Sequence, residues 1–283
     1  MRRSRAFLAP VGFCAAALLA ATGCSGGADD VSAGGGAKAR PAAGDSTAAA
    51  ASADPGKALR DAVAATRGTS VRLDQEIELG DGTKTYQMSI TGDFDLAGDK
   101  GRIAVEMPGG VGDKRMDEIF VDGTVYLRGV VKGAEDKWGS ISRDKAEAHS
   151  VLRAPLNDPE HALVQVAAAK KVSDEGTATV NGSPTTHYRG MLDHATTASR
   201  LDKSTRGKLD EARELLGDDL PVFADAWVDD AGRVVRTRLT FDMSGAGMTT
   251  TMTFSDFGQP VKATAPPTAE TVPLTSVAGV FPG

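Results

Sequence analysis

Short turn segments rich in glycine, aspartate and asparagine interrupt this chain, and they separate stretches in which apolar and polar residues alternate. Alternation with a period of two places every second side chain on the same face of a β-strand. Two such strands joined by a short turn pair antiparallel. The turn segments are 80–82, 98–101, 122–123, 181–182, 230–232 and 245–247. This pattern predicts a long antiparallel sheet of about nine to eleven strands.

Three segments depart from the alternation and show the spacing of amphipathic helices, namely 57–66, 158–170 and 204–216. The second begins with Asp158 and Pro159, a capping residue and a proline that suit the first turn of a helix. The apolar residues expected to share one face of the third are Leu209, Ala212, Leu215 and Leu216. A few helices packed on one face of such a sheet make an α+β domain.

The N-terminus has the features of an export signal. Arg2, Arg3 and Arg5 precede an apolar run of about 16 residues, shorter than the roughly 20 that cross a bilayer as a helix. Small residues and then Cys24 follow, a sequence that resembles a bacterial lipobox. The resemblance implies that 1–23 is a lipoprotein signal peptide and that Cys24 is lipidated and becomes the mature N-terminus. A secretory signal with a chance cysteine, or an uncleaved anchor, is the alternative.

Residues 24–55 are rich in alanine, glycine and serine and contain no aromatic residue. Such a segment buries too little surface to offset its ordering entropy, so we expect a disordered tether, followed by one domain over 56–267. The tail 268–283 is expected to trail along the surface. Acyl chains on Cys24 would hold the protein on the extracytoplasmic face of the cell membrane. The formal charge of −6 would become −9 without the three signal-peptide arginines, which argues against nucleic-acid binding.

The sequence shows no motif of catalytic or cofactor chemistry: it has neither a Gly-x-Ser-x-Gly elbow nor a phosphate-binding glycine-rich loop with lysine. No metal-site spacing is found among the four histidines, His149, His161, His187 and His194. The acidic pairs Asp218-Asp219 and Asp229-Asp230 fall at a helix end and a turn, where aspartate is favoured structurally. We therefore expect no enzyme, no cofactor and no metal; a hydrolase using an acidic pair is the enzymatic alternative.

The alternating strands give the sheet one continuous apolar face of moderate-sized side chains. Methionines on this face are unbranched and adaptable, which suits a surface that accepts a flexible apolar ligand. The alternative is ordinary core packing against the helices, and some residues are core in either case. The candidate ligand-binding residues are Val71, Leu73, Ile77, Met88, Ile90, Phe94, Ile103, Val105, Leu239, Phe241, Met243 and Met252.

The C-terminal third carries a resemblance to a known family. The segments that carry it are 220–222, 226–236 and 254–261, together with upstream features at 92–95, 126–128, Trp138 and 186–190. These resemble the LppX/LprA/LprF/LprG lipoproteins of actinobacteria, which belong to the LolA-like fold class. Within 226–236 we expect a hairpin that marks the fold, formed by Trp227, Asp229, Gly232, Arg233 and Arg236.

The resemblance implies a half-barrel, a strongly curved antiparallel sheet wrapped around a few helices with an apolar cavity between them. Members of the family bind acylated lipids or glycolipids there and help to carry them across the cell envelope. We expect the helices 158–170 and 204–216 to line such a cavity. The alternative function is a non-catalytic envelope sensor or interaction module with a closed cavity and a protein partner.

Overall fold

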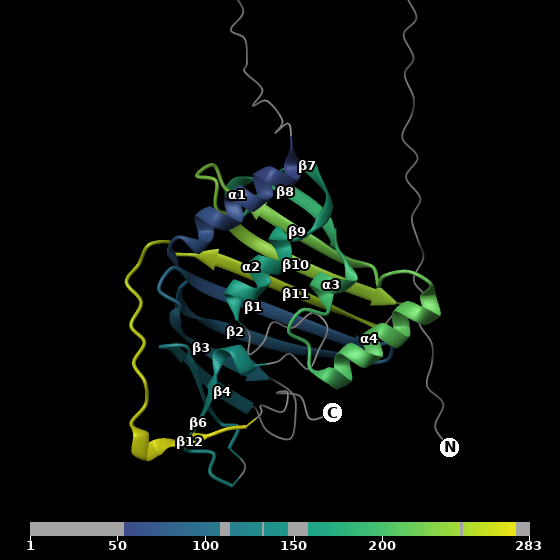
Figure 1. Ribbon diagram of the computed structural model, residues 1–283. Helices are drawn as coiled ribbons and strands as arrows, with labels where there is room; N and C mark the ends of the chain where they lie inside the picture. The colour runs from purple at the N-terminus through teal and green to yellow at the C-terminus, as the bar shows by residue number, and fades with distance from the viewer. Residues whose placement is uncertain (1–53, 108–113, 132, 147–157, 244–245, 276–283) are drawn as a thin grey trace, which may run out of the picture. The chain divides into compact units, whose positions relative to one another are not determined.

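The computed structural model describes residues 54–107, 114–131, 133–146, 158–243 and 246–275 (Figure 1). Twelve strands form one sheet in the order β12-β6-β5-β4-β3-β2-β1-β11-β10-β9-β8-β7. The strands are β1 (Ser70–Asp81), β2 (Thr85–Asp95), β3 (Lys100–Met107), β4 (Lys114–Val121), β5 (Thr124–Arg128), β6 (Trp138–Ser142), β7 (Lys170–Val180), β8 (Ser183–Leu192), β9 (Val222–Val228), β10 (Val234–Met243), β11 (Ala246–Ser255) and β12 (Thr271–Pro273). Strands β1 to β11 pair antiparallel, which confirms the predicted sheet.

Two of the predicted turns are two-residue loops that join the strands of a hairpin. Their backbone conformation favours the residue types found there. Asp122 and Gly123 have φ of 50° and 68°, and Asn181 and Gly182 have φ of 50° and 81°. Positive φ at both central residues defines the turn whose twist matches paired strands, and Asp-Gly and Asn-Gly supply it at low cost.

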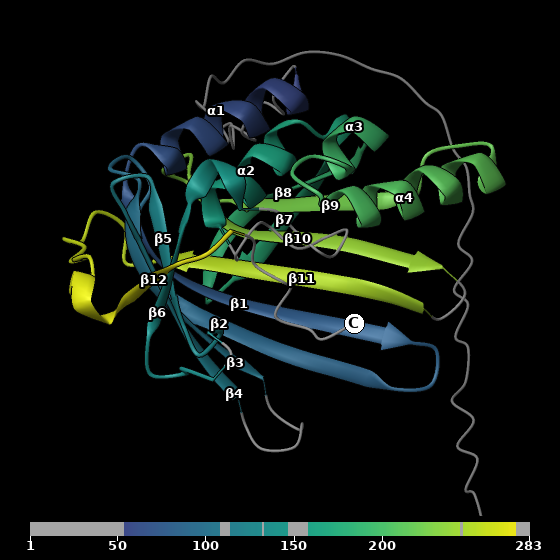
Figure 2. The same ribbon diagram turned by 60° about the horizontal axis from the view of Figure 1, so that its bottom comes forward.

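The helices are α1 (Pro55–Arg67), α2 (Pro159–Ala167), α3 (His194–Thr197) and α4 (Lys203–Leu216), with 3₁₀ turns η1 (Arg143–Lys145) and η3 (Thr268–Glu270). An aspartate caps each α-helix by accepting backbone N–H groups of its first turn; these are Asp54, Asp158, Asp193 and Asp202. Figure 2 shows that the four α-helices lie on one side of a strongly curved sheet. We call this side of the sheet the inner face and the opposite side the outer face. The described residues contain no helix that is both long enough and apolar enough to span a bilayer.

Two details of the predicted helices were wrong. The second helix ends at Ala167 and not at residue 170, because Lys170 already pairs with Met191 as the first residue of β7. In α4, Leu209 is buried, but Leu215 is 89% exposed and Leu216 is 47% exposed. The predicted apolar face of α4 therefore packs against the domain through Leu209 and, in part, Ala212, but not through Leu215 and Leu216.

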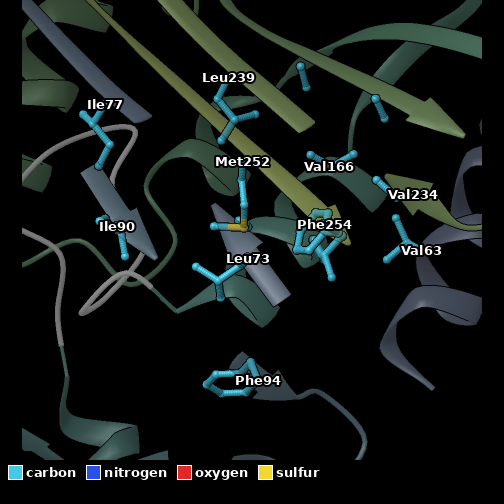
Figure 3. Packing of buried hydrophobic residues seen from close by; sticks show 14 of the residues in the cluster. Val63, Leu73, Ile77, Ile90, Phe94, Val166, Val234, Leu239, Met252 and Phe254 are labelled. Atoms are coloured by element: carbon cyan, nitrogen blue, oxygen red, sulfur yellow. The ribbon is translucent and has the colours of Figure 1, made fainter. Parts of the chain in front are cut away.

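The core lies between the inner face and the helices α1 and α2. Figure 3 shows Val63 of α1 and Val166 of α2 beside Val234 and Phe254 of the sheet. A buried hydrogen bond reinforces this packing: Thr66 of α1 accepts a bond of 2.8 Å from the backbone N–H of Val234, where β10 is bulged. The bond satisfies a backbone donor that the irregular pairing would otherwise leave unpaired.

Two inward-facing glycines allow neighbouring strands to approach closely where the sheet bends. A Cβ on Gly92 of β2 would lie 2.1 Å from the carbonyl oxygen of Arg102 on β3. A Cβ on Gly101 of β3 would lie 2.3 Å from the ring of Phe94. Because a Cβ at either place would clash with the neighbouring strand, both positions require glycine.

The C-terminal tail does more than trail along the surface as expected. Thr271–Pro273 forms β12 and pairs parallel with β6 at the edge of the sheet. The backbone N–H of Leu274 donates a 2.8 Å bond to Ser140, and the Leu274 side chain packs where a Cβ on Gly139 would stand. The tail thereby covers hydrogen-bonding groups that an edge strand leaves open.

Candidate functional site

Ten of the twelve candidate residues form part of one buried cluster on the inner face, and none of the ten is more than 2% exposed. They are Val71, Leu73, Ile77, Met88, Ile90, Phe94, Ile103, Val105, Leu239 and Met252. Phe241 is partly buried and packs against the same cluster. Met243 ends β10, and its side chain lies outside the described residues, as does Cys24 with the whole of 1–53. The parity of the strands therefore brings the described candidates to one face.

The register of the strands makes this face continuous from β10 to β3. Leu239 of β10 stands opposite Thr250 of β11, which stands opposite Ile77 of β1, and Ile77 stands opposite Met88 of β2. In the next row, Met252, Gln75, Ile90 and Val105 follow one another across four strands. In Figure 3 the side chains of Leu239, Ile77 and Ile90 lie away from the α1 and α2 residues, which gather near Phe254. We call the part of the inner face formed by these two rows the acyl-site patch.

Polar residues on the acyl-site patch were missed by the sequence interpretation. Gln75 is 1% exposed and Thr250 is 5% exposed, although both lie among apolar neighbours. Gln75 occupies the inward position between Leu73 and Ile77, so strand parity was the signal that could have found it. A buried polar side chain on an apolar face carries a cost unless it meets a hydrogen-bonding partner.

Two small pockets lie near the hairpin ends of the same strands, and their polar lining faces outward. One, of about 130 Å³, lies among Glu76, Glu78, Gln87 and Ser89, which alternate with the inward residues Ile77 and Met88. The other, of about 170 Å³, lies among Glu78, Thr240, Asp242 and Thr249. Both are smaller than the several hundred Å³ of a typical pocket for a drug-sized ligand. In this conformation the apolar side chains themselves occupy most of the acyl-site patch.

A larger polar pocket of about 560 Å³ lies at the other end of the strands, beside η1 and the start of α2. Its centre is Arg143, whose side chain is 14% exposed and pairs with Asp158 at 2.8 Å, with Glu160 at 3.5 Å and with Asp99. The guanidinium carbon also lies 5.5 Å from the ring centre of Phe94 and 5.3 Å from that of Phe120. Arg143 thus ties the β2–β3 turn to α2 over two core aromatic rings.

Burial and the charge of Arg143 shift the pKa values of the neighbouring acids in opposite directions. Burial raises the pKa of Asp158 above its ordinary value, although the charge of Arg143 acts in the lowering direction. The pKa of Asp99 is raised in the same way, by burial first and with the same opposition from Arg143. The charge of Arg143 therefore offsets part of the cost of burying the Asp158 carboxyl group.

His161 of α2 lines the same pocket, and its Nε2 is buried without a hydrogen-bond partner among the described residues. Burial, followed by repulsion from Arg200, lowers the pKa of His161 from 6.5 to about 4. The unfolded chain therefore takes up a proton at a higher pH than the folded chain does. We expect the free energy of unfolding to fall by about 2 kcal/mol between pH 7 and pH 5 through this residue.

Urea unfolding at each pH measures this effect. His161→Gln should lose that part of the pH dependence, whereas His194→Gln, at a histidine bonded to Asp210 at 2.8 Å on α4, should retain it. An unchanged pH slope in His161→Gln would show that His161 is protonated equally easily in both states.

The other sequence motifs take structural roles on the outer face. Asp229 closes the β9–β10 hairpin: its carboxylate accepts bonds from the backbone N–H of Arg233 at 2.8 Å and from the Arg233 guanidinium at 2.8 Å and 3.0 Å. His187 stacks on Trp227 at 4.6 Å and bonds to Asp225 at 2.8 Å. Within the described residues, no cluster of three histidine, cysteine or acidic side chains could hold a metal ion.

Comparison with known proteins supports the family suggested by the sequence. The model of the LppX_LprAFG lipoprotein family matches residues 54–263. The chain is similar to the crystal structure of LprF from Mycobacterium bovis, with 16% identity and a TM-score of 0.46 over 75% of this chain and 96% of that one. It is similar to that of the Mycobacterium tuberculosis lipoprotein LppX, with 16% identity and a TM-score of 0.47 over 74% and 98%.

A weaker likeness links the chain to the Pseudomonas aeruginosa MucA/MucB complex, with 13% identity and a TM-score of 0.37 over 75% of this chain and 59% of that one. Among curated proteins no relative matches. The family match extends from the cap of α1 to beyond β11 and so includes the acyl-site patch and the polar pocket. The chain therefore belongs to the LppX_LprAFG lipoprotein family.

Proposed function

We propose that this protein is a lipid-anchored, extracytoplasmic lipoprotein that binds the acyl chains of a lipid or lipoglycan on its inner face and carries or chaperones that lipid across the envelope. The observation that carries the proposal is the continuous apolar face described above, on which ten candidate residues from five strands are buried together. No covalent chemistry is needed, because each methylene group removed from water contributes about 0.8 kcal/mol.

Entry of a chain requires a covering element to move, and α4 has the contacts of such an element. Leu209 is its buried residue, while Leu215 and Leu216 remain exposed. Polar bonds hold α4 in place: Asp210 with His194 at 2.8 Å, and Arg213 with Asp219 at 2.8 Å. In the proposal, α4 moves away to admit the chain, and the exposed leucines then contact lipid.

Attachment at Cys24 would place this domain near its lipid source. A tether of 24–55, treated as a flexible chain, has an r.m.s. reach of about 30 Å. In the proposal the domain thus stays close to the membrane while its inner face remains free to exchange lipid with a partner.

The close packing of the acyl-site patch favours a second candidate, an envelope sensor or interaction module with a closed inner face. Its supporting observation is that ten of the twelve candidate side chains are at most 2% exposed, so that they already fill the space beside one another. Such a module would bind a protein partner and no lipid. The two candidates differ in whether an acyl chain can enter the acyl-site patch.

Titration of a fluorescent fatty-acyl probe into the domain, residues 54–283, tests the proposal. We expect the wild type to bind the probe and Leu239→Trp to bind it at least about tenfold more weakly, because the indole occupies space on the acyl-site patch. Arg238→Trp is the matched control, since Arg238 is the adjacent residue and is exposed on the outer face. A wild-type domain that binds neither the probe nor added lipids would favour the interaction module.

A further inference from the structure

Gln75 is a polar side chain in the middle of the acyl-site patch. It lies on β1, opposite Ile90 of β2 and Met252 of β11, and follows Leu73 by two residues on the same face. It is 1% exposed, and neither Oε1 nor Nε2 has a hydrogen-bond partner among the described residues. An amide that could both donate and accept hydrogen bonds is therefore enclosed by apolar side chains.

Thr250, in the neighbouring row of the acyl-site patch, also has a buried polar group without a partner among the described residues. The residue is 5% exposed, and the buried group is its Oγ1. Thr250 stands opposite Ile77, the next inward residue after Gln75, so the two polar groups are diagonal neighbours on one face. Buried polar groups are nearly always satisfied in native proteins, and two exceptions side by side indicate a partner that arrives from outside the chain.

The character of the surroundings limits what that partner can be. The residues across from Gln75 and Thr250 are Ile90, Met252, Ile77 and Leu239, all of them uncharged. A phosphate or a free carboxylate would need a cationic partner to lose its water at such a place. A neutral ester carbonyl or a hydroxyl group can be satisfied by an amide and a hydroxyl.

We propose that Gln75, assisted by Thr250, hydrogen-bonds an ester or hydroxyl group carried by the bound lipid and thereby selects ester-linked or hydroxylated chains over plain hydrocarbon. This inference rests on the proposed function and names the ligand class of the same site. The apolar residues supply affinity, while Gln75 fixes how deep the chain lies, because its amide meets the polar group at one position along the chain. Lipids without such a group leave the amide unpaired and bind more weakly.

Competition between two matched lipids measures this selectivity. Dipalmitoylglycerol and its dihexadecyl ether analogue have chains of equal length and differ in the ester carbonyls; each displaces the fluorescent acyl probe from residues 54–283. We expect the wild type to prefer the ester lipid by about tenfold, the effect of one well-placed hydrogen bond. Gln75→Met, of similar shape, should reduce that preference to about one while still binding the ether lipid.

Gln87→Met is the matched control, since Gln87 is exposed on β2 and bonds to Glu78 at 3.3 Å; its ester preference should equal that of the wild type. Urea unfolding accompanies each titration, and Gln75→Met should raise the urea midpoint of the ligand-free domain because an unpaired amide is removed. If Gln75→Met does not fold, Thr250→Val provides the second test and should lower the ester preference without abolishing binding.

Three results would overturn the inference, and they can be told apart. An undiminished ester preference in Gln75→Met, together with a raised urea midpoint, would mean that the amide is unpaired but makes no hydrogen bond to the lipid. Equal binding of ester and ether lipids by the wild type would contradict the inferred selectivity but not the proposed lipid binding. A wild type that binds neither lipid would remove the proposed function itself, and the inference with it.

Discussion

Replacing Gly92 with alanine is expected to lower the free energy of unfolding by about 3 kcal/mol. The new methyl group would stand 2.1 Å from the Arg102 carbonyl oxygen and 2.7 Å from the Cα atom of Ile103. Both are backbone atoms of the paired strand β3, so relief of the clash requires β2 and β3 to separate where the sheet bends. Equilibrium unfolding in urea, followed by tryptophan fluorescence, measures the change.

Gly207→Ala is the control for this prediction. Gly207 lies within α4, and a Cβ there would meet no atom within 4 Å. Alanine in an exposed helix is favoured over glycine, so Gly207→Ala should stabilise the domain by about 0.5 to 1 kcal/mol. If Gly92→Ala were as harmless as Gly207→Ala, the close approach of β2 and β3 would not be what shapes the sheet.

Replacing Arg143 with methionine is expected to cost about 3 to 5 kcal/mol of stability. Methionine keeps much of the apolar packing over Phe94 and Phe120 but removes the charge that faces Asp158 at 2.8 Å. The side chain of Asp158 is 12% exposed, and an acid buried to that degree without its partner is either destabilising or protonated. Urea unfolding at pH 7 should show the loss, and it should be smaller at pH 4, where protonation of Asp158 relieves the unpaired charge.

Arg115→Met is the corresponding control on the outer face. Arg115 pairs with Glu106 at 2.9 Å, but the two side chains are 59% and 58% exposed. Exposed ion pairs contribute little, so the free energy of unfolding should change by less than about 1 kcal/mol. Equal effects of Arg143→Met and Arg115→Met would contradict the structural role assigned to Arg143.

The local elements of this fold were predictable because each depends on residues that are neighbours in sequence. Alternation placed Leu73, Ile77 and Ile90 on one face, and Asp158 with Pro159 marked the start of α2. Asp-Gly and Asn-Gly marked two-residue turns because they adopt positive φ easily. The family match then confirmed what the hairpin motif around Trp227 had suggested.

Features that join distant segments could not be read from these patterns. Nothing near Thr271 in sequence indicates that it pairs with Trp138 on β6, since that contact depends on where the chain returns. The same holds for Arg143, whose carboxylate partners come from a turn 44 residues earlier and from α2. The role of Gly92 depends on how closely β3 approaches it, and strand periodicity does not indicate that distance.

The candidate site was predictable in position but not in detail. Strand parity identifies which side chains point inward. It does not distinguish residues that line a cavity from residues that fill a core, because both are apolar and buried. Gln75 is also identifiable as an inward residue, since it follows Leu73 by two positions, although a polar side chain does not contribute to an apolar pattern. The unsatisfied amide became visible only once its neighbours on β2 and β11 were known.

Native mass spectrometry of residues 54–283, purified from a lipid-rich bacterial host, tests lipid binding on the inner face most directly. We expect a second population of the wild-type protein whose added mass equals that of an acylated lipid recoverable by organic extraction. That population should disappear in Leu239→Trp and persist in Arg238→Trp. A wild-type protein of bare polypeptide mass that also takes up no added lipid would contradict the account and leave the interaction module as the function of this fold.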